Sequence, residues 1–218
     1  MAKKVGVLLA GCGVFDGSEI HEAVLTLLFL DRAGAEIVCM APDMDQMHVI
    51  NHLTQEVSPE NRNVLVESAR IARGAIQNVK VIQASDIDAL IIPGGFGAAK
   101  NLSDFAVKGA DAVVHEQVQR LLNAMASAGK PIGAICIAPA TLTKAVADQK
   151  PEVTIGNDVG TAAAIEQMGG KHQNCTVDMI HVDQGNRLVT TPAYMLGPGI
   201  KDVAVGIEKL VQQVMAMI

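Results

Sequence analysis

The chain has 218 residues, of which half are hydrophobic and 18% are charged, and its formal net charge is −6. This composition predicts a globular chain that buries a full core, and it is unlike that of a disordered segment. The acidic balance and the scarcity of aromatic residues disfavour nucleic acid as a partner, because phosphates need basic surfaces and unpaired bases need rings on which to stack.

The first apolar run is "VGVLLA" at 5–10, which follows two lysines. Six residues are too few for the core of a secretory signal or for a membrane-spanning helix. The run also leads directly into Gly11, Cys12 and Gly13. We therefore expect it to be the first strand of a cytoplasmic protein that has no membrane partner.

Short aliphatic runs alternate with longer amphipathic segments through most of the chain. The runs expected as strands lie at 5–10, 35–41, 88–94, 130–135 and 152–156. The segments expected as helices lie at 19–33, between Ser58 and Gly74, at 111–128, at 161–168 and at 199–217. Ser58 can cap the second helix, with Pro59 at its first position. This alternation predicts a parallel sheet flanked by helices, and because no linker or repeat interrupts it, we expect a single α/β domain over residues 1–218.

Two further strand-like runs, 178–183 and 187–191, depart from this rhythm. Only Gln184, Gly185 and Asn186 join them. Such a short connection is typical of an antiparallel hairpin. We therefore expect the sheet to be mixed near one edge.

The cysteines and glycines do not form a recognisable cofactor motif. Cys12, Cys39, Cys136 and Cys175 lack Cys-x-x-Cys spacing, which disfavours structural zinc and a disulfide framework. Gly17 comes one residue too late after Gly11 and Gly13 for a dinucleotide-binding loop, so a tight turn is the better interpretation. We expect neither a cofactor nor a bound metal.

Cys136 stands between the run that ends at Ile135 and a segment in which Pro139 suits a helix start. This pattern predicts a strand-to-helix turn at the carboxyl edge of the sheet, where open α/β sheets bind ligands. The N–H groups and dipole of a helix start lower a thiol's pKa, which favours a nucleophile. The alternative is a buried cysteine that only packs.

The groups that could assist such a nucleophile come from two loops and the first helix. The N–H groups of Gly95 and Ile137 could together form an oxyanion hole. Glu22 interrupts the apolar stretch of the first helix, and Glu19 lies one turn before it, so either carboxyl is a candidate acid/base unless it is simply solvated. A carboxylate beside a thiol raises the thiol's pKa, so an interacting carboxyl should be protonated and donate a hydrogen bond to the thiolate.

A histidine partner is less well supported. The residue after Cys136 is Ile137 rather than histidine. His21 on the first helix and His181 in the hairpin remain conceivable neighbours of the thiol. For both, a surface or hydrogen-bonded structural histidine is the better interpretation.

The segments "IIPGGFGAAKNLSDFA", "GKPIGAICIAPATL" and "VTTPAYML", after "GCGVFDGSEIHEAVLTL" near the start, resemble the ElbB-type branch of the class I glutamine amidotransferase-like, PfpI-related superfamily. The resemblance implies a flavodoxin-like three-layer α/β/α sandwich. It also implies that Cys136 is the nucleophile on the elbow, that Glu22 is its acidic partner, and that Gly95 and Ile137 supply the oxyanion donors.

The same resemblance implies a cofactor-independent glyoxalase, with a related deglycase interpretation, and a homodimer. Cys136 would attack a small aldehyde such as glyoxal or methylglyoxal to form a hemithioacetal, and Glu22 would transfer the proton that leads to a 2-hydroxy acid. Where PfpI-type peptidases and related glyoxalases usually have Cys-His-Gly, this chain has "CIA", and it also lacks the late His-x-Glu of true amidotransferases. Proteolysis and glutamine hydrolysis are therefore disfavoured.

The alternative from a different functional class is a non-enzymatic redox or stress-response protein. In that case oxidation of Cys136 would alter a partner interaction, and Cys12 could act as the resolving thiol.

Overall fold

The structure is a computed structural model that describes residues 2–218. Seven strands form one sheet in the order β3-β2-β1-β4-β5-β9-β8. These strands are β1 (Lys4–Leu8), β2 (Glu36–Ala41), β3 (Ile76–Asn78), β4 (Ala89–Ile92), β5 (Ile132–Ile135), β8 (His181–Asp183) and β9 (Leu188–Thr191). All neighbouring pairs are parallel except β8 and β9, which are antiparallel at the edge. The predicted parallel sheet with a mixed edge hairpin is confirmed.

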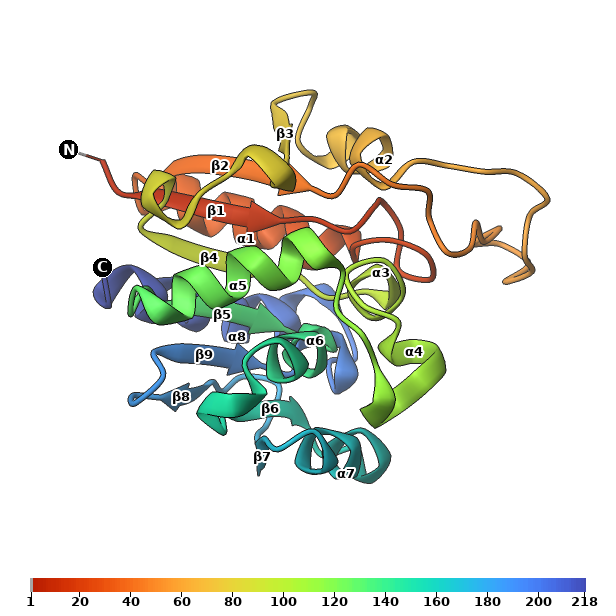
Figure 1. Ribbon diagram of the computed structural model, residues 1–218. Helices are drawn as coiled ribbons and strands as arrows, with labels where there is room; N and C mark the ends of the chain where they lie inside the picture. The colour runs from red at the N-terminus through yellow and green to blue at the C-terminus, as the bar shows by residue number, and fades with distance from the viewer. Residues whose placement is uncertain (1) are drawn as a thin grey trace.

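Helices cover both faces of the sheet (Figure 1). The helices are α1 (Ile20–Arg32), α2 (Val64–Ile71), α3 (Phe96–Lys100), α4 (Phe105–Lys108), α5 (Glu116–Ser127), α6 (Ala138–Ala145), α7 (Val159–Gln167) and α8 (Ile200–Ala216). Apolar residues of α1, α2 and α8 pack on one face, and those of α3, α5 and α6 pack on the other. The predicted three-layer, flavodoxin-like sandwich is therefore confirmed.

Alternation along the strands explains the two layers of core. In β4, Leu90 and Ile92 face the α5 side, whereas Ala89 and Ile91 face the α1 and α8 side. Side chains of a strand point to opposite faces in turn, so a strand buried on both faces is apolar throughout. This is why each central strand corresponds to an uninterrupted aliphatic run in the amino-acid sequence.

The second helix begins later than the sequence indicates. Asn63 caps α2 by accepting the backbone N–H of Val66 at 3.1 Å. Ser58 does not cap a helix, because its hydroxyl donates to Glu60 at 3.1 Å on the surface. The segment 42–63 instead forms a long projecting excursion between β2 and α2 (Figure 1).

The carboxyl half holds two further departures. The run at 152–156 is a strand, β6 (Glu152–Gly156), but it pairs with β7 (Lys171–Asn174) in a separate two-stranded sheet. The helix expected from 111 begins only at Glu116, since Gly109–Asp111 forms a separate 3₁₀ turn. The helix expected at 161–168 spans Val159–Gln167.

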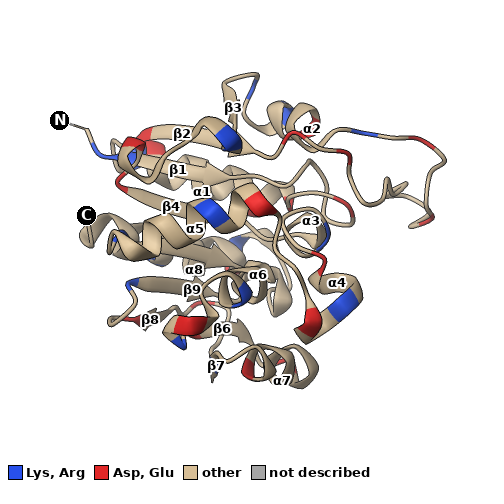
Figure 2. Cartoon of the chain, in the orientation of Figure 1, with Lys and Arg blue, Asp and Glu red and all other residues tan. Residues whose placement is uncertain are grey.

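Lysine and arginine are scattered over strands, helices and loops (Figure 2). None of the helices within residues 2–218 combines the length and the hydropathy that crossing a membrane requires. Over the same range, no three His, Cys, Asp or Glu side chains come together as a metal-binding group would.

Candidate active site

Cys136 occupies the turn between β5 and α6. Its backbone φ is +62°, in the left-handed region that a residue with a Cβ adopts at a cost of about 1–2 kcal/mol. The N–H of Cys136 donates to the carbonyl of Thr191 in β9 at 2.9 Å, which ties the turn to the neighbouring strand. The side chain is only 8% exposed. This is the strained strand-to-helix turn on which α/β enzymes present a nucleophile.

Glu22 reaches the thiol from the first turn of α1. Its side chain is fully buried and hydrogen-bonds to the Cys136 side chain. One carboxyl oxygen, Oε2, accepts the N–H of Gly94 at 2.9 Å, and the other, Oε1, accepts the N–H of Tyr194 at 3.2 Å. Three separate loops at the carboxyl edge of the sheet therefore converge on this one carboxyl.

Burial changes the protonation of Glu22. Loss of water around the carboxyl, together with the nearby charge of Glu19, raises the pKa of Glu22 to about 8, although the N–H bonds from Tyr194 and Gly94 act in the opposite direction. At neutral pH Glu22 is therefore mostly protonated and can donate a hydrogen bond. The sequence left open whether Glu19 or Glu22 meets the thiol. Glu19 instead caps α1, since its carboxylate accepts the Glu22 N–H at 2.7 Å.

The pKa of the Cys136 thiol is also raised. Burial is the largest cause, and the charge of Glu22 adds to it, whereas N–H bonds from Gly95 and Ile137 to the sulfur lower the pKa. The donors act in the direction that the sequence indicates, but burial outweighs them. The helix start therefore lowers the pKa of the thiol as expected, but the net shift in the free protein is upward.

Gly94 and Gly95 allow the close approach of these groups. A Cβ on Gly94 would overlap the Cβ of Cys136 and the Oε2 atom of Glu22. Gly95 has φ of +92°, and a Cβ there would overlap the backbone nitrogen of Glu19. The glycine pair after β4 is thus required by the packing of the site as well as by its own backbone.

The N–H groups proposed as oxyanion donors, those of Gly95 and Ile137, both lie at the Cys136 sulfur. In the free protein both lower the pKa of the thiol. An oxygen on a carbon bonded to that sulfur would lie within the same set of donors. The two loops and the first turn of α1 therefore bring together the four residues that the family resemblance indicates.

The other residues that the sequence offers as partners of Cys136 do not contact the thiol in the described structure. The Nδ1 atom of His21 is 2.8 Å from the Tyr194 hydroxyl, and its side chain is half exposed. His181 lies beside Glu152 of β6, at 3.7 Å. Cys12 is a free thiol whose pKa burial raises most and the charge of Glu67 in α2 raises next. The structure therefore gives Cys12 a place beside α2 rather than a role as partner of Cys136.

Tyr194 is the site residue that the sequence did not single out. It lies in the 3₁₀ turn η5 (Ala193–Met195) directly after β9. Its contribution to Glu22 is a backbone N–H, which any residue but proline could supply. Only the position after Pro192, at the end of a predicted strand, could have indicated it.

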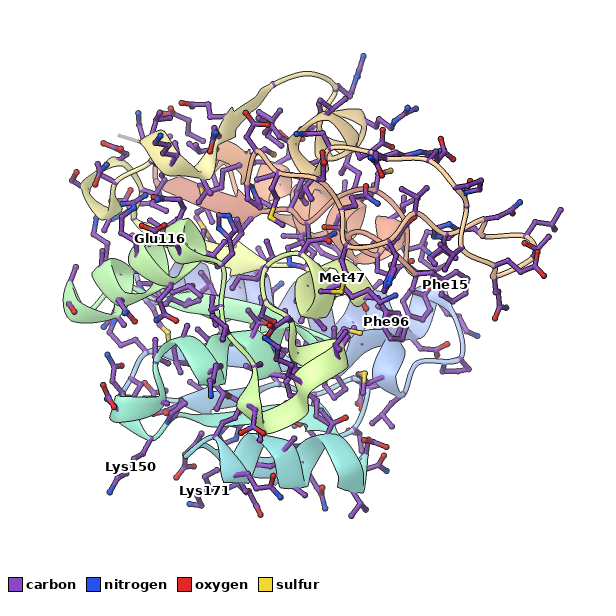
Figure 3. All side chains as sticks on the ribbon, turned by 45° about the vertical axis from the view of Figure 1, so that its right-hand side comes forward. Phe15, Met47, Phe96, Glu116, Lys150 and Lys171 are labelled. Carbon is purple, nitrogen blue, oxygen red and sulfur yellow. The ribbon has the colours of Figure 1, made fainter. Side chains whose placement is uncertain are left out.

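The loops around this edge support one another. The side chains of Phe15, Met47 and Phe96, from the first loop, the 42–63 segment and α3, gather at one side of the molecule (Figure 3). The N–H of Phe96 donates to the carbonyl of Val14 at 2.7 Å, and Lys100 donates to the carbonyl of Phe15 at 3.0 Å. These contacts tie the first loop to α3 and so help hold the Gly95 backbone in place.

Comparisons with known proteins agree with this arrangement. The chain matches the DJ-1/PfpI family over residues 7–194. It is 47% identical over 226 residues to human glutamine amidotransferase-like class 1 domain-containing protein 3, mitochondrial, covering 99% of this chain and 84% of that protein. A crystal structure of an isoprenoid biosynthesis protein with an amidotransferase-like domain from Ehrlichia chaffeensis has a TM-score of 0.92 at 38% identity, covering 99% of this chain and all of the other. Glyoxalase III from Candida albicans has a TM-score of 0.63 at 14% identity, covering 99% and 97% of the two chains, and this likeness shows a shared fold alone. The chain therefore belongs to the DJ-1/PfpI family.

Proposed function

We propose that this protein is a glutathione-independent glyoxalase of the ElbB type, which converts glyoxal or a related 2-oxoaldehyde into a 2-hydroxy acid. The observation that carries the proposal is the contact between the Cys136 thiol and a buried Glu22 carboxyl whose pKa is raised to about 8. Such a carboxyl can both donate and accept a proton near neutral pH, and the reaction needs both steps.

The first step adds the sulfur to the aldehyde. Loss of one proton from the Cys136 and Glu22 pair leaves one negative charge between them. When Glu22 keeps the remaining proton, the charge lies on the sulfur, where Gly95 and Ile137 donate their N–H groups. The thiolate then forms a C–S bond with the carbonyl carbon, and the carbonyl oxygen takes the proton from Glu22. The product is a hemithioacetal, and Glu22 is left as a carboxylate.

The second step moves a proton between adjacent carbons. Glu22 removes the hydrogen from the carbon that carries the sulfur, which gives an enediol, and the proton is returned to the neighbouring carbon. The carbon bonded to sulfur becomes a thioester as its neighbour is reduced to an alcohol, so no external oxidant is required. Water then cleaves the thioester, releasing the 2-hydroxy acid and restoring the thiol.

Access to Cys136 favours a small substrate. The side chain is 8% exposed, and Glu22, Gly94 and Gly95 pack directly around it. The carboxyls of Glu19 and Glu22 also make a site of this kind better suited to a neutral carbonyl compound than to an anion. A free dicarbonyl therefore fits better than an aldehyde adduct on the side chain of another protein, which the deglycase interpretation requires. The shared fold of a protein named glyoxalase III is compatible with this chemistry.

The test is conversion of glyoxal to glycolate without added glutathione, followed by nuclear magnetic resonance. Cys136→Ala is expected to abolish the conversion, and Glu22→Gln is expected to lower it by at least about 100-fold, the usual contribution of a general acid/base. Cys175→Ser changes another free, partly buried thiol and should leave the rate unchanged. Glycolate formation by the Cys136→Ala protein would exclude the proposed mechanism. A parallel assay with a glycated peptide distinguishes the deglycase interpretation.

The redox alternative has less support. Burial and the Glu22 charge raise the pKa of Cys136, whereas redox-sensing cysteines are exposed and low in pKa. Cys12 lies toward α2 and is not bonded to Cys136.

A further inference from the structure

Three hydrogen bonds and one longer contact link Glu22, Tyr194, His21 and Glu19. The backbone N–H of Tyr194 donates to Oε1 of Glu22 at 3.2 Å. The Tyr194 hydroxyl lies 2.8 Å from Nδ1 of His21, which is on the first turn of α1. His21 in turn lies 3.9 Å from Glu19, whose other oxygen accepts the Glu22 N–H at 2.7 Å. The two ends of Tyr194, backbone and phenol, thus both contact the first turn of α1.

The segment that carries Tyr194 is held in an unfavourable conformation. Ala193 has φ of +44°, although it is not a glycine, and its side chain is fully buried. A residue with a Cβ keeps such a φ only where the surrounding contacts require it. Three contacts do so here, since the carbonyl of Thr191 accepts the Cys136 N–H at one end and Tyr194 contacts Glu22 and His21 at the other.

We propose that Tyr194 is a positioning residue for the reacting pair, because its phenol, anchored on His21, holds the Tyr194 peptide N–H against Glu22. With Oε1 occupied by this N–H, the other oxygen, Oε2, stays on the Gly94 N–H, and the carboxyl stays against the Cys136 thiol. The proposal rests on Cys136 and Glu22 as the reacting pair of the proposed function. It assigns to Tyr194 and His21 a role that does not involve contact with the substrate.

This role has a consequence for titration. The N–H of Tyr194 stabilises the ionised form of Glu22 and so opposes the effect of burial. The other groups that face Glu22 are Glu19, whose charge raises its pKa, and the Cys136 thiol. If the phenol loses its anchor, the N–H bond weakens, and the pair should lose its proton at a higher pH. A residue that only fills space at the rim would not move this titration.

The test measures the rate at which iodoacetamide alkylates Cys136 as a function of pH, with the modified peptide identified by mass spectrometry. The midpoint is the pH at which the alkylation rate reaches half of its maximum. In Tyr194→Phe, which removes only the hydroxyl, this midpoint is expected to rise by about one pH unit, the size of shift that weakening one hydrogen bond to a carboxylate gives. His21→Ala should produce the same rise. Because the His21 side chain is half exposed, His21→Ala is expected to fold, and it tests the proposal even if Tyr194→Phe does not fold.

Two controls separate positioning from other effects. His21→Asn keeps a polar group near the place of Nδ1 but no ionisable ring, and it should restore the wild-type midpoint. Val118→Ala removes buried methyl groups from α5, on the opposite face of the sheet, and lowers stability there, so its midpoint should equal that of the wild type. An unchanged midpoint in Tyr194→Phe, or an equal rise in His21→Asn and His21→Ala, would overturn the proposal.

The alkylation reaction requires no turnover of an aldehyde. A shifted midpoint in a protein that does not convert glyoxal would contradict the proposed function and leave the positioning role standing. Conversion of glyoxal with an unshifted midpoint would contradict the positioning role and leave the proposed function standing.

Discussion

The carboxyl of Glu22 and the thiol of Cys136 contact each other although they come from opposite parts of the chain, one from the first turn of α1 and the other from the turn after β5. They meet because β1, β4 and β5 are adjacent and parallel, so the loops that follow these strands lie at the same edge of the sheet. The charge of Glu22 raises the pKa of Cys136, whereas the hydrogen bond with the Cys136 thiol lowers the pKa of Glu22. The two groups therefore titrate as a pair, and four predictions depend on this pair and on the backbone around it.

The first prediction concerns the pH dependence of the proposed reaction. The reactive form has lost one proton from the pair, and burial raises the pKa of Glu22 to about 8. We therefore expect kcat/KM for glyoxal to increase with pH through neutrality and to level off above about pH 8, because kcat/KM reports the ionisation of the free protein. The measurement is the initial rate at low glyoxal concentration across this range. A rate that is constant from about pH 6 upward would contradict a shared proton at this site.

The second prediction concerns stability, which the same group links to pH. The unfolded chain ionises Glu22 near the ordinary glutamate pKa of 4.5, whereas the folded protein retains the proton up to about 8. Between these values the folded state binds more protons, so the free energy of unfolding contributed by Glu22 decreases as pH rises. The slope is about 1.4 kcal/mol per pH unit, and the total over this window is at most about 5 kcal/mol.

Glu22→Gln has no titratable group at this position, so its free energy of unfolding lacks this dependence on pH. The amide nitrogen of glutamine cannot accept a hydrogen bond, so either the Gly94 or the Tyr194 N–H loses its acceptor. The variant should therefore be less stable than the wild type by about 1–3 kcal/mol near pH 5. The difference should shrink, or reverse, by about pH 8. Urea unfolding at several pH values compares the two proteins. Parallel curves across the window would show that Glu22 is not protonated in the folded state.

Much of the architecture could be predicted because it depends on burial. The strands β1, β4 and β5 are buried on both faces, so they appear in the sequence as uninterrupted aliphatic runs. β7 could not be found in this way, since its residues Lys171–Asn174 are polar and partly exposed. The start of α2 was misplaced because Ser58 and Pro59 have the residue types of a helix start, whereas Asn63 forms the actual cap.

The site was predictable to a different degree for each residue. Cys136 could be placed on its turn by local pattern alone, and Gly95 by the glycine pair after a strand. Glu22 could not be fixed locally, because a carboxyl on a helix is ordinarily solvated, and its complete burial depends on long-range packing against Gly94 and Tyr194. The side chain of Tyr194 carries no signal for its contact with Glu22, which is made by its backbone N–H, and only its position after Pro192 could indicate it.

The third prediction concerns Gly94. A Cβ there would overlap Cys136 Cβ and Glu22 Oε2, and neither group has room to move in a buried site. Gly94→Ala is therefore expected to lower the free energy of unfolding by about 1–3 kcal/mol, as overpacking does. It should also reduce glyoxal conversion by at least about 100-fold, because it separates the acid/base from the nucleophile.

Gly160→Ala is the matched control for this change. Gly160 lies in α7, where the nearest atom to an added Cβ is the Asp158 carboxylate at 3.6 Å. Alanine there should stabilise the helix by up to about 1 kcal/mol and leave activity unchanged. If Gly94→Ala behaved like this control, the packing of Glu22 against Cys136 would not be the constraint at Gly94.

The fourth prediction separates the backbone strain at Cys136 from the chemistry of its thiol. Because φ is +62° at this position, a residue with a Cβ is strained whatever its side chain, whereas glycine adopts the same conformation freely. Both Cys136→Ala and Cys136→Gly remove the nucleophile, so both should be inactive toward glyoxal. Cys136→Gly should nevertheless be more stable than Cys136→Ala by about 1 kcal/mol in chemical denaturation. At Ala140, inside α6, the order should be reversed, since Ala140→Gly should cost about 1 kcal/mol. If glycine were the less stable choice at both positions, the turn would carry no strain, and the thiol would be held in place by side-chain contacts alone.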